Sequence, residues 1–337
     1  MTEKTRRMNR LHGLYFYAAF SIFALLFFPF IGAEKIDFQT ILSDLQQGPI
    51  TQIDTDIFIF HRLPRVLLAF LTGAVLAVSG NTFQVILRNS LATPYTLGVT
   101  GGAAVGAYIA IAVPALHFSF GKMTTVQLMA MAGSGIIVFL IYLASRKRNG
   151  ISTHTMLLAG VTISIMCGAL IILIRYLTKP NLLVSLDRWT MGRLDTVGFD
   201  SFYSTIPLSI IGLVLIGLNA RTLNHISLGE DMAMGHGVDV AKVQKFCFIG
   251  GSIATASVVS VAGPIGFIGL IVPHVVRKIS GFDNQIVMLG SFCMGGAFLV
   301  MCDAMARTLV APTEIPVGVI TALIGGPCFV YLLVKRS

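Results

Sequence analysis

The residues that could take part in acid–base or ion-binding chemistry lie outside the long apolar stretches of this chain. None of the 15 Asp and Glu residues falls in the middle of such a stretch, and Asp303 stands at the end of one. Ion-coupled transporters and pumps usually carry a carboxylate inside the membrane to bind the ion or proton. The sequence offers no candidate for that role.

Motifs for other kinds of chemistry are also absent from the sequence. It contains no G-x-x-x-x-G-K-[ST] phosphate loop, no H-E-x-x-H zinc motif and no G-x-S-x-G nucleophile motif. The five cysteines lie in apolar stretches and form no C-x-x-C pair, so we interpret them as packing residues. We therefore expect no catalytic residue, no metal site and no cofactor bound by this chain.

The composition is that of a membrane protein. Of the 337 residues, 55% are hydrophobic and 12% are charged, whereas about 25% of residues are charged in soluble proteins. This excludes a disordered chain and an ordinary soluble enzyme. The net charge of +9 suits either nucleic acid or a membrane surface, and the hydropathy favours the membrane.

The elements that must position any functional residue are therefore transmembrane helices. A helix crosses the membrane with about 20 apolar residues. Uncharged stretches indicate nine such segments, and Gly263-Pro264 divides the longest into two because proline breaks a helix. We predict an all-α polytopic membrane protein, with residues 1–337 as a single transmembrane domain. Its ten spans are expected at about residues 14–33, 66–87, 94–114, 123–145, 152–174, 201–220, 243–262, 264–281, 284–303 and 315–334.

The distribution of charge predicts the orientation. With ten spans and both termini in the cytoplasm, the inner segments hold 15 of the 24 Lys and Arg residues but only 5 of the 15 acids, as the positive-inside rule requires. The excess of positive charge then reports orientation, and we predict no nucleic-acid partner. The first span could instead be a signal peptide, but its length and the weak cleavage site at Ile31-Gly32-Ala33 favour an uncleaved helix.

Small residues recur along the spans, as in Gly73-Ala74, Ala77 and Ser79-Gly80. Such residues let helix backbones approach closely inside a membrane. A polytopic bundle packed in this way is typical of a transporter or channel.

Several segments together resemble the permease subunits of bacterial ABC importers for iron–siderophores, haem and vitamin B12, which are type II importers. The matching pieces lie in order between Arg62 and Phe329. The most specific are R-L-P-R, L-L-A-G-V, G-P-I-G-F-I-G-L-I-V-P-H and E-I-P-V-G-V-I-T-A-L-I-G-G-P-C-F. The resemblance implies a ten-helix permease of the bacterial cytoplasmic membrane. It also implies a homodimer in membrane lipid with two ATPase subunits, which bind ATP and Mg, and an extracytoplasmic substrate-binding protein.

The resemblance also assigns roles to residues on the outer face. Arg62, Arg65 and Arg307 match arginines that pair with glutamates of the binding protein. Cationic patches of this kind orient an acidic partner. The alternative is that these side chains merely snorkel at helix ends.

Two groups of residues on the inner face match functional parts of the family. The segment 226–240 matches the coupling helices that enter a groove on the ATPase, although it could be a plain loop. Its residues of interest are Leu228, Gly229, Glu230, Ala233, Gly235, Gly237 and Val238. Asn89 with Leu91, and Ser152 with Thr153, match the inner gate; alternatively Asn89 caps a turn and Ser152 caps the fifth span. Ser90 and Thr93 depart from the family pattern beside this gate.

We therefore predict the membrane subunit of an ATP-driven importer of a metal chelate, and specifically of a ferric siderophore. Haem and vitamin B12 remain alternative substrates. An ion-coupled secondary transporter or a channel is the alternative from another class. The missing carboxylates inside the spans and the polar segment 228–238 speak against it.

Overall fold

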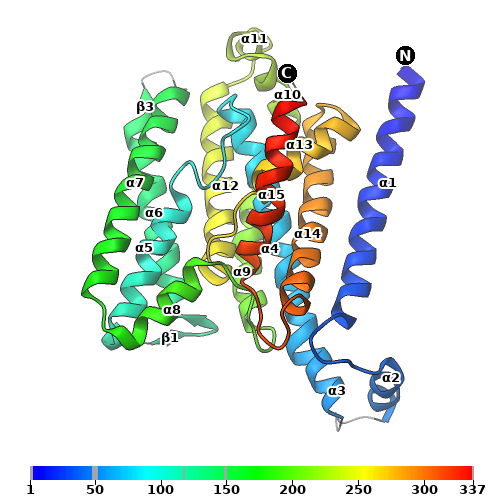
Figure 1. The fold of residues 1–337 in the computed structure, drawn as a ribbon. Helices are drawn as coiled ribbons and strands as arrows, with labels where there is room; N and C mark the ends of the chain where they lie inside the picture. The colour runs from blue at the N-terminus through cyan, green and yellow to red at the C-terminus, as the bar shows by residue number, and fades with distance from the viewer. Residues whose placement is uncertain (1–2, 48–51, 117, 148–149, 336–337) are drawn as a thin grey trace.

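The helix α4 (Leu63–Ile86) runs through the centre of a helical bundle, as the computed structural model shows (Figure 1). The structure describes residues 3–47, 52–116, 118–147 and 150–335. Nineteen residues of α4 are buried, because it contacts helices on several sides, chiefly α14 (Asn284–Thr308), α12 (Val240–Ala262) and α13 (Ile268–Ser280). The all-α fold class is confirmed.

The remaining elements surround this centre. The helices α5 (Val99–Ala112), α6 (Thr125–Ser145) and α7 (Thr153–Leu177) pack on one another and form one side of the bundle (Figure 1). The other elements are α1 (Glu3–Phe27), η1 (Phe28–Phe30), α2 (Phe38–Gln47), α3 (Ile53–Asp56), η2 (Ile57–Arg62), η3 (Pro114–Leu116), α8 (Pro180–Thr190), α9 (Asp200–Gly217), α10 (Ala220–Leu228), α11 (Glu230–Gly235) and α15 (Val317–Val334). Two short antiparallel hairpins pair β1 (Ser119–Phe120) with β2 (Met123–Thr124) and β3 (Arg146–Lys147) with β4 (Gly150–Ile151).

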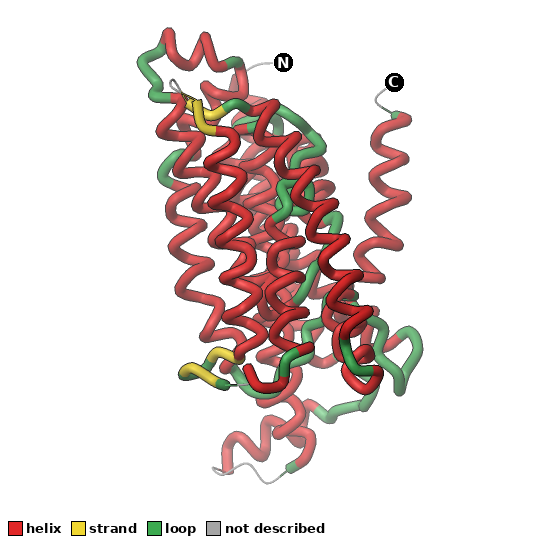
Figure 2. The backbone as a smooth tube through the Cα atoms, turned by 90° about the vertical axis from the view of Figure 1, so that its left-hand side faces the viewer, coloured by secondary structure: helices red, strands yellow, loops and turns green. Residues whose placement is uncertain are grey.

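Each of the ten expected spans overlaps one long helix, in the order α1, α4, α5, α6, α7, α9, α12, α13, α14 and α15. Among the described residues, seven helical stretches are long and apolar enough to cross a membrane. The helices α5 and α13 and the apolar stretch Val317–Leu332 of α15 are shorter, so the count of ten stays a prediction. The first residues of α1 and the last residues of α15 lie at the same end of the bundle, which is also the end that carries α11 (Figures 1 and 2).

Glycine backbones hold the centre together, as the small-residue pattern predicts. A Cβ atom added to Gly73 would overlap the carbonyl group of Gly295 in α14. One added to Gly80 would overlap the backbone of Gly269 in α13. Because only glycine allows this approach, α4, α13 and α14 pack as a closely fitted group.

Several helix boundaries differ from the predicted spans, and two of the differences bear on the arginines Arg62, Arg65 and Arg307. The second predicted span begins at residue 66, but a continuous helix runs from Ile53 to Ile86 through a six-residue π-helical turn, η2. Pro64 lies in the first turn of α4, and the wider π turn before it leaves room for a ring that would clash with the carbonyl four residues earlier. At the other end, α14 continues to Thr308 rather than ending at 303, because Asp303 and Arg307 pair one turn apart on its surface.

The only Trp, Trp189, belongs to helix α8 and is 8% exposed. It packs in the main hydrophobic core with Leu194 and Ile265. The amphipathic α8 folds back over the bundle at the end opposite α11 (Figure 1), so Trp189 faces protein.

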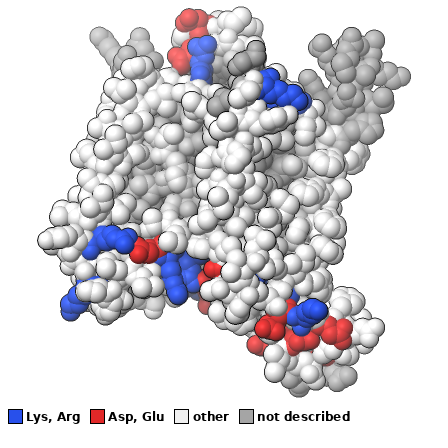
Figure 3. Space-filling model, in the orientation of Figure 1, with Lys and Arg blue, Asp and Glu red and all other residues white. Residues whose placement is uncertain are grey.

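Charged side chains are concentrated at the two ends of the bundle, and the surface between them is largely uncharged (Figure 3). This is the distribution expected of a protein that spans a membrane.

Candidate docking, coupling and gating sites

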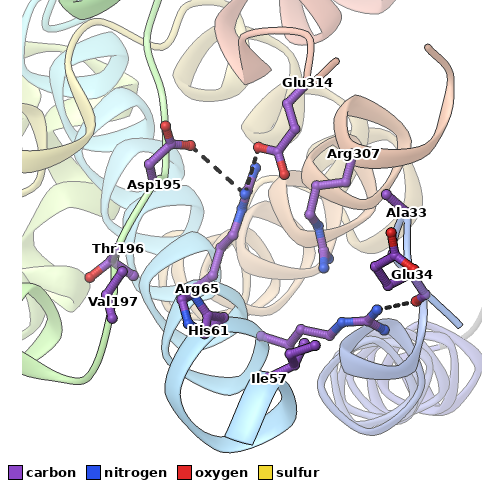
Figure 4. Close-up of a pocket in the computed structure, with 12 residues that line it drawn as sticks. Ala33, Glu34, Ile57, His61, Arg65, Asp195, Thr196, Val197, Arg307 and Glu314 are labelled. Atoms are coloured by element: carbon purple, nitrogen blue, oxygen red, sulfur yellow. Dashed lines mark hydrogen bonds and ion pairs between the residues drawn. The ribbon is translucent and has the colours of Figure 1, made fainter. Parts of the chain in front are cut away.

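The three arginines predicted to face a binding protein line one cavity. Arg62, Arg65 and Arg307 line a cavity of about 530 Å³, and Figure 4 shows Arg65 and Arg307 within it. The start of α4, which carries Arg65, lies at the end of the bundle opposite α11 (Figure 1). Arg62 ends the π-helical turn, Arg65 follows in the first turn of α4, and Arg307 lies near the end of α14. The chain thus brings them together from parts of the sequence that are more than 240 residues apart.

These arginines are already paired within the chain. The Nε atom of Arg65 donates to Asp303 Oδ1 at 2.9 Å, and its Nη1 atom donates to Glu314 Oε2 at 2.8 Å. Asp303 is fully buried and also pairs with the Arg307 Nε atom at 3.1 Å. Arg62 is 5% exposed and donates to the backbone carbonyls of the segment after α1, including Phe30 at 3.0 Å. Surface snorkelling therefore does not describe these side chains.

The Nη2 atom of Arg307 is the exception within this cluster. It is buried and has no hydrogen-bond partner among the described residues. A buried donor without a partner costs free energy, and the atom belongs to a residue that lines the cavity. The cavity therefore retains capacity to bind an oxygen acceptor.

A second cavity of about 380 Å³ adjoins the first through Arg65, Asp195 and Glu314. It adds Arg188 and Arg193, which the sequence reasoning did not assign to docking. The pKa of Arg193 is lowered from its ordinary value, because burial removes water from the guanidinium and because Arg188 and Arg65 add positive charge nearby. The signal that could have identified it was its place in the polar segment that follows Trp189.

The predicted coupling segment forms a short projection at the other end of the bundle (Figure 1). Gly229, with φ 139°, separates α10 from α11, and Gly237, with φ 76°, ends the projection. Both values favour glycine. Ala233 is fully buried, and its carbonyl accepts from the amide of Val238 at 3.0 Å, which fixes the segment in a compact turn.

The outer surface of this projection exposes three large apolar side chains beside the exposed acid Asp231. Leu228 is 66% exposed, Met232 57% and Met234 55%. The two methionines were not among the predicted coupling residues, although they lie inside the predicted segment. Exposed methionine and leucine side chains on a projection are typical of a surface that packs against another protein.

Both predicted gate pairs form local caps. The Asn89 Oδ1 atom accepts from the amide of Leu91 at 2.9 Å, and Ser152 caps α7 by accepting from the amide of Thr155. The capping alternatives are therefore shown, and the structure leaves the gate role as a prediction. Among the described residues, no hydrogen bond joins one pair to the other.

Each pair does lie against the coupling segment. Asn89 and Leu228 line the same cavity of about 540 Å³. Glu230 Oε1 accepts from Gln244 Nε2 at 2.9 Å and lies 3.5 Å from the Thr153 hydroxyl. The first residues of α7 and the turn after α4 are thus both next to the segment that would meet an ATPase.

Within the described residues, His, Cys, Asp and Glu side chains do not gather in groups of three or more that could hold a metal ion.

The comparisons with known proteins agree on one family. Residues 19–335 match the FecCD transport family. The chain is 38% identical over 283 residues to the uncharacterized ABC transporter permease protein YvrB of Bacillus subtilis, covering 84% of this chain and 80% of that protein. It is 39% identical over 276 residues to the cobalamin import system permease protein BtuC of Halobacterium salinarum, covering 82% and 73%.

Two further matches extend over nearly the whole chain. The hemin transport system permease protein HmuU of Yersinia pestis is 35% identical over 309 residues, covering 91% of this chain and 90% of that protein. A solved structure described as an inward-facing, metal-chelate type ABC transporter superposes with a TM-score of 0.83 at 28% identity, covering 96% of this chain and 98% of that one.

Proposed function

Because the chain belongs to the FecCD transport family and is an ABC transporter permease, we propose that it is the membrane subunit of an ATP-driven importer for a ferric siderophore. In this proposal the chain works as a homodimer in the bacterial cytoplasmic membrane, with both termini inside. Two ATPase subunits bind ATP and Mg on the inner face, and a binding protein delivers the chelate outside. The relatives that transport hemin and cobalamin make haem and vitamin B12 the alternative substrates.

The observation that carries this proposal is the division of the two ends of the bundle. One end has a cavity lined by Arg62, Arg65 and Arg307, and the other has a projection with exposed Leu228 and Met232. The guanidinium groups in this cavity, which also holds Glu34, Asp195 and Glu314, suit an acidic side chain of a binding protein. The exposed apolar side chains of the projection suit a groove on an ATPase.

The spans themselves supply no energy source. Asp303 is buried in α14, but it is paired with two arginines near the outer end of that helix. A carboxylate held in this way is a poor carrier for a transported ion. This supports an ATPase partner over an ion-coupled mechanism.

The direct test is uptake into proteoliposomes that contain the permease, its ATPase and its binding protein. We expect import of a ferric siderophore that depends on ATP, and no import when the ATPase is omitted. Haem and cobalamin serve as the competing substrates. Import that persists without the ATPase would contradict the proposal, and selective import of haem or cobalamin would replace the substrate.

Gly235 offers a sharp test of the coupling segment. It is exposed, has no atom within 4 Å of the position its Cβ would occupy, and has no positive φ. Gly235→Trp should therefore leave the permease folded while blocking the ATPase, and Gly235→Ala is the matched control. Gly237→Trp is less informative because its φ of 76° would strain any other residue. Normal co-purification of the ATPase with Gly235→Trp would remove this assignment.

The gate proposal can be tested through Leu91, which is 50% exposed. We expect Leu91→Cys to react with a water-soluble thiol reagent at rates that differ between the ATP-bound and nucleotide-free transporter. Equal rates in both states would argue against a gate at this position.

The docking proposal predicts that Arg65→Ala weakens binding of the binding protein. Arg175→Ala is the control, because Arg175 is an exposed arginine that pairs with Asp187 and does not line the cavity. Equal binding by both variants at low salt would remove Arg65 from the interface.

A further inference from the structure

A chain of polar side chains joins four helices at the end of the bundle that carries the coupling segment. Its members come from α4, α10, α13 and the start of α14, and we call them the polar joint: Asn81, Gln84, Asn224, Arg277, Asp283 and Asn284. None of them was predicted to have a role, because each appears in the sequence as an isolated polar residue or as part of an inner cationic segment.

The centre of the joint is a guanidinium held by two amides. The Nη1 atom of Arg277 donates to Gln84 Oε1, and its Nη2 atom donates to Asn81 Oδ1, both at 2.6 Å. Asn81 is fully buried and Gln84 is 4% exposed. Both amides also donate, Gln84 to the carbonyl of Gly269 at 3.2 Å and Asn81 to Asn284 Oδ1 at 3.4 Å. Satisfied bonds of this kind are needed to bury amide groups without a large cost.

Asn224 joins α10 to the polar joint. Its Oδ1 atom accepts from the backbone amide of Asn284 at 2.7 Å, and its Nδ2 atom donates to Asp283 Oδ1 at 3.1 Å. Asp283 is the residue that caps α14. One side chain of α10 therefore binds the first turn of α14 through two hydrogen bonds, accepting one and donating the other.

Asn224 lies close to the start of the coupling projection. It lies four residues before Leu228, where the coupling projection begins. Beyond it, α14 packs on α4 through Gly73 and Gly295, and α4 packs on α13 through Gly80 and Gly269. A displacement of α10 that moves the start of α14 would therefore move closely packed helices together.

We propose that Asn224 is a positioning residue that transmits movement of the coupling segment to α14, and through Asn284, Asn81 and Arg277 to α4 and α13. The inference rests on the proposed function, since it assigns the source of movement to an ATPase. It adds the residue through which that movement enters the membrane helices. One of the two hydrogen bonds of Asn224 joins it to the Asp283 side chain, so its donor and acceptor can be exchanged by substitution, and this makes the inference testable.

The experiment measures the ratio of substrate imported to ATP hydrolysed by the reconstituted transporter. Asn224→Ala removes both bonds, and we expect the ratio to fall at least fivefold while ATP hydrolysis continues. Asn224→Asp places a second carboxylate beside Asp283, and like charges at this distance repel, so the ratio should fall at least as far. The Asp283 Oδ1 atom accepts both from Asn224 Nδ2 and from the backbone amide of Gln285. Adding Asp283→Asn removes the repulsion and supplies a donor for the new carboxylate at the expense of the Gln285 bond, so the double variant should recover part of the ratio that Asn224→Asp loses.

Thr222→Ala is the matched control, because Thr222 lies on the same helix as Asn224, outside the segment 226–240, and makes none of the bonds of the polar joint. It should leave the ratio unchanged. If Asn224 had only a structural role, its replacement would lower the yield of assembled transporter, or would lower the rates of import and of ATP hydrolysis equally. In either case the ratio of the two rates would stay unchanged. A normal ratio in Asn224→Ala, or a double variant no better than Asn224→Asp, overturns the inference. If Asn224→Ala does not assemble, the comparison of Asn224→Asp with the double variant decides the matter.

The same experiment gives a different result if the proposed function, rather than the role of Asn224, is wrong. In that case the unchanged protein would itself show no ATP-dependent import, whereas failure of this inference leaves that import intact.

Discussion

Replacement of Asp303 tests whether the arginine cavity is held together by one buried carboxylate. Asp303 is fully buried, and the side chains of its partners Arg65 and Arg307 are 12% and 5% exposed. Removing one partner of a buried ion pair costs about 3–5 kcal/mol, because the remaining charge is left without compensation. Since Asp303→Asn keeps one oxygen that can accept a hydrogen bond, we expect a loss near the lower limit, about 3 kcal/mol.

The measurement is unfolding by SDS in mixed micelles, followed by the fluorescence of Trp189, which is the only Trp and is 8% exposed. Glu314→Gln is the control, because Glu314 also pairs with Arg65 but its side chain is 42% exposed. An ion pair with this degree of exposure contributes about 0–1 kcal/mol to the free energy of unfolding. Adding Arg307→Met to Asp303→Asn should recover part of the loss by removing one uncompensated charge. Equal, small losses for Asp303→Asn and Glu314→Gln would refute the reasoning.

Three further substitutions have defined outcomes. Gly80→Ala should reduce the free energy of unfolding by about 1–3 kcal/mol because its Cβ overlaps the α13 backbone, whereas exposed Gly135→Ala, with open space around it, should not; both are measured by the same SDS unfolding. Ser152→Ala should lower the free energy of unfolding by about 1 kcal/mol through loss of the α7 cap. An unchanged free energy of unfolding would contradict the cap. Hydrogen bonds from the Thr40 hydroxyl and nearby amides lower the pKa of Asp37. The ionised carboxylate therefore stabilises the start of α2 fully above the usual aspartate pKa of about 3.9, and this stabilisation is lost as the carboxylate is protonated. Hydrogen-exchange protection of α2 should therefore fall as pH drops below that value, and Asp37→Asn should abolish this dependence.

The membrane helices could be predicted because their signal is local. A stretch such as 152–174 is long, apolar and uncharged, and α7 covers it. The signal for the split at Gly263-Pro264 is also local, and the structure agrees with it: α12 ends at Ala262 and α13 begins at Ile268. The helices α2 and α8, which lie at the end of the bundle opposite α11 (Figure 1), were missed because they are short and amphipathic. Polar residues on one face make such helices resemble loops in a search for apolar length.

The pairing of the site residues could not be predicted because it depends on contacts between distant parts of the chain. Asp303 and Glu314 lie 238 and 249 residues from Arg65. Each looks like an ordinary charge at the end of a span. The same holds for Asn81, whose partner Arg277 is 196 residues away. The resemblance to a family located Arg62, Arg65 and Arg307, but only the fold shows which acids neutralise them.

This internal neutralisation changes how a docking partner would be recognised. A carboxylate from a binding protein that enters the cavity meets an Arg65 already bonded to Glu314 at 2.8 Å. Glu314 and Asp195 are the acids that can be displaced, because their side chains are 42% and 40% exposed whereas Asp303 is fully buried. Glu314 is the closer of the two, at 2.8 Å from the Arg65 Nη1 atom against 3.8 Å for Asp195. The exchange of one exposed ion pair for another yields little net affinity, so the cavity would contribute chiefly to the orientation of the partner.

It follows that Glu314→Gln should strengthen binding of the binding protein. Without its closer exposed competitor, Arg65 should bind the incoming carboxylate more tightly by about 0.4–1 kcal/mol, or roughly two- to fivefold in Kd. The gain should shrink as salt rises from 50 to 500 mM, because exposed charges are screened over a few ångströms at high ionic strength. Affinity measured at both salt concentrations tests this, with Asp200→Asn as the control because Asp200 pairs with Lys122 and does not line the cavity. Weaker binding by Glu314→Gln would mean that Glu314 itself contacts the partner, and the cavity would then recognise a cation as well as a carboxylate.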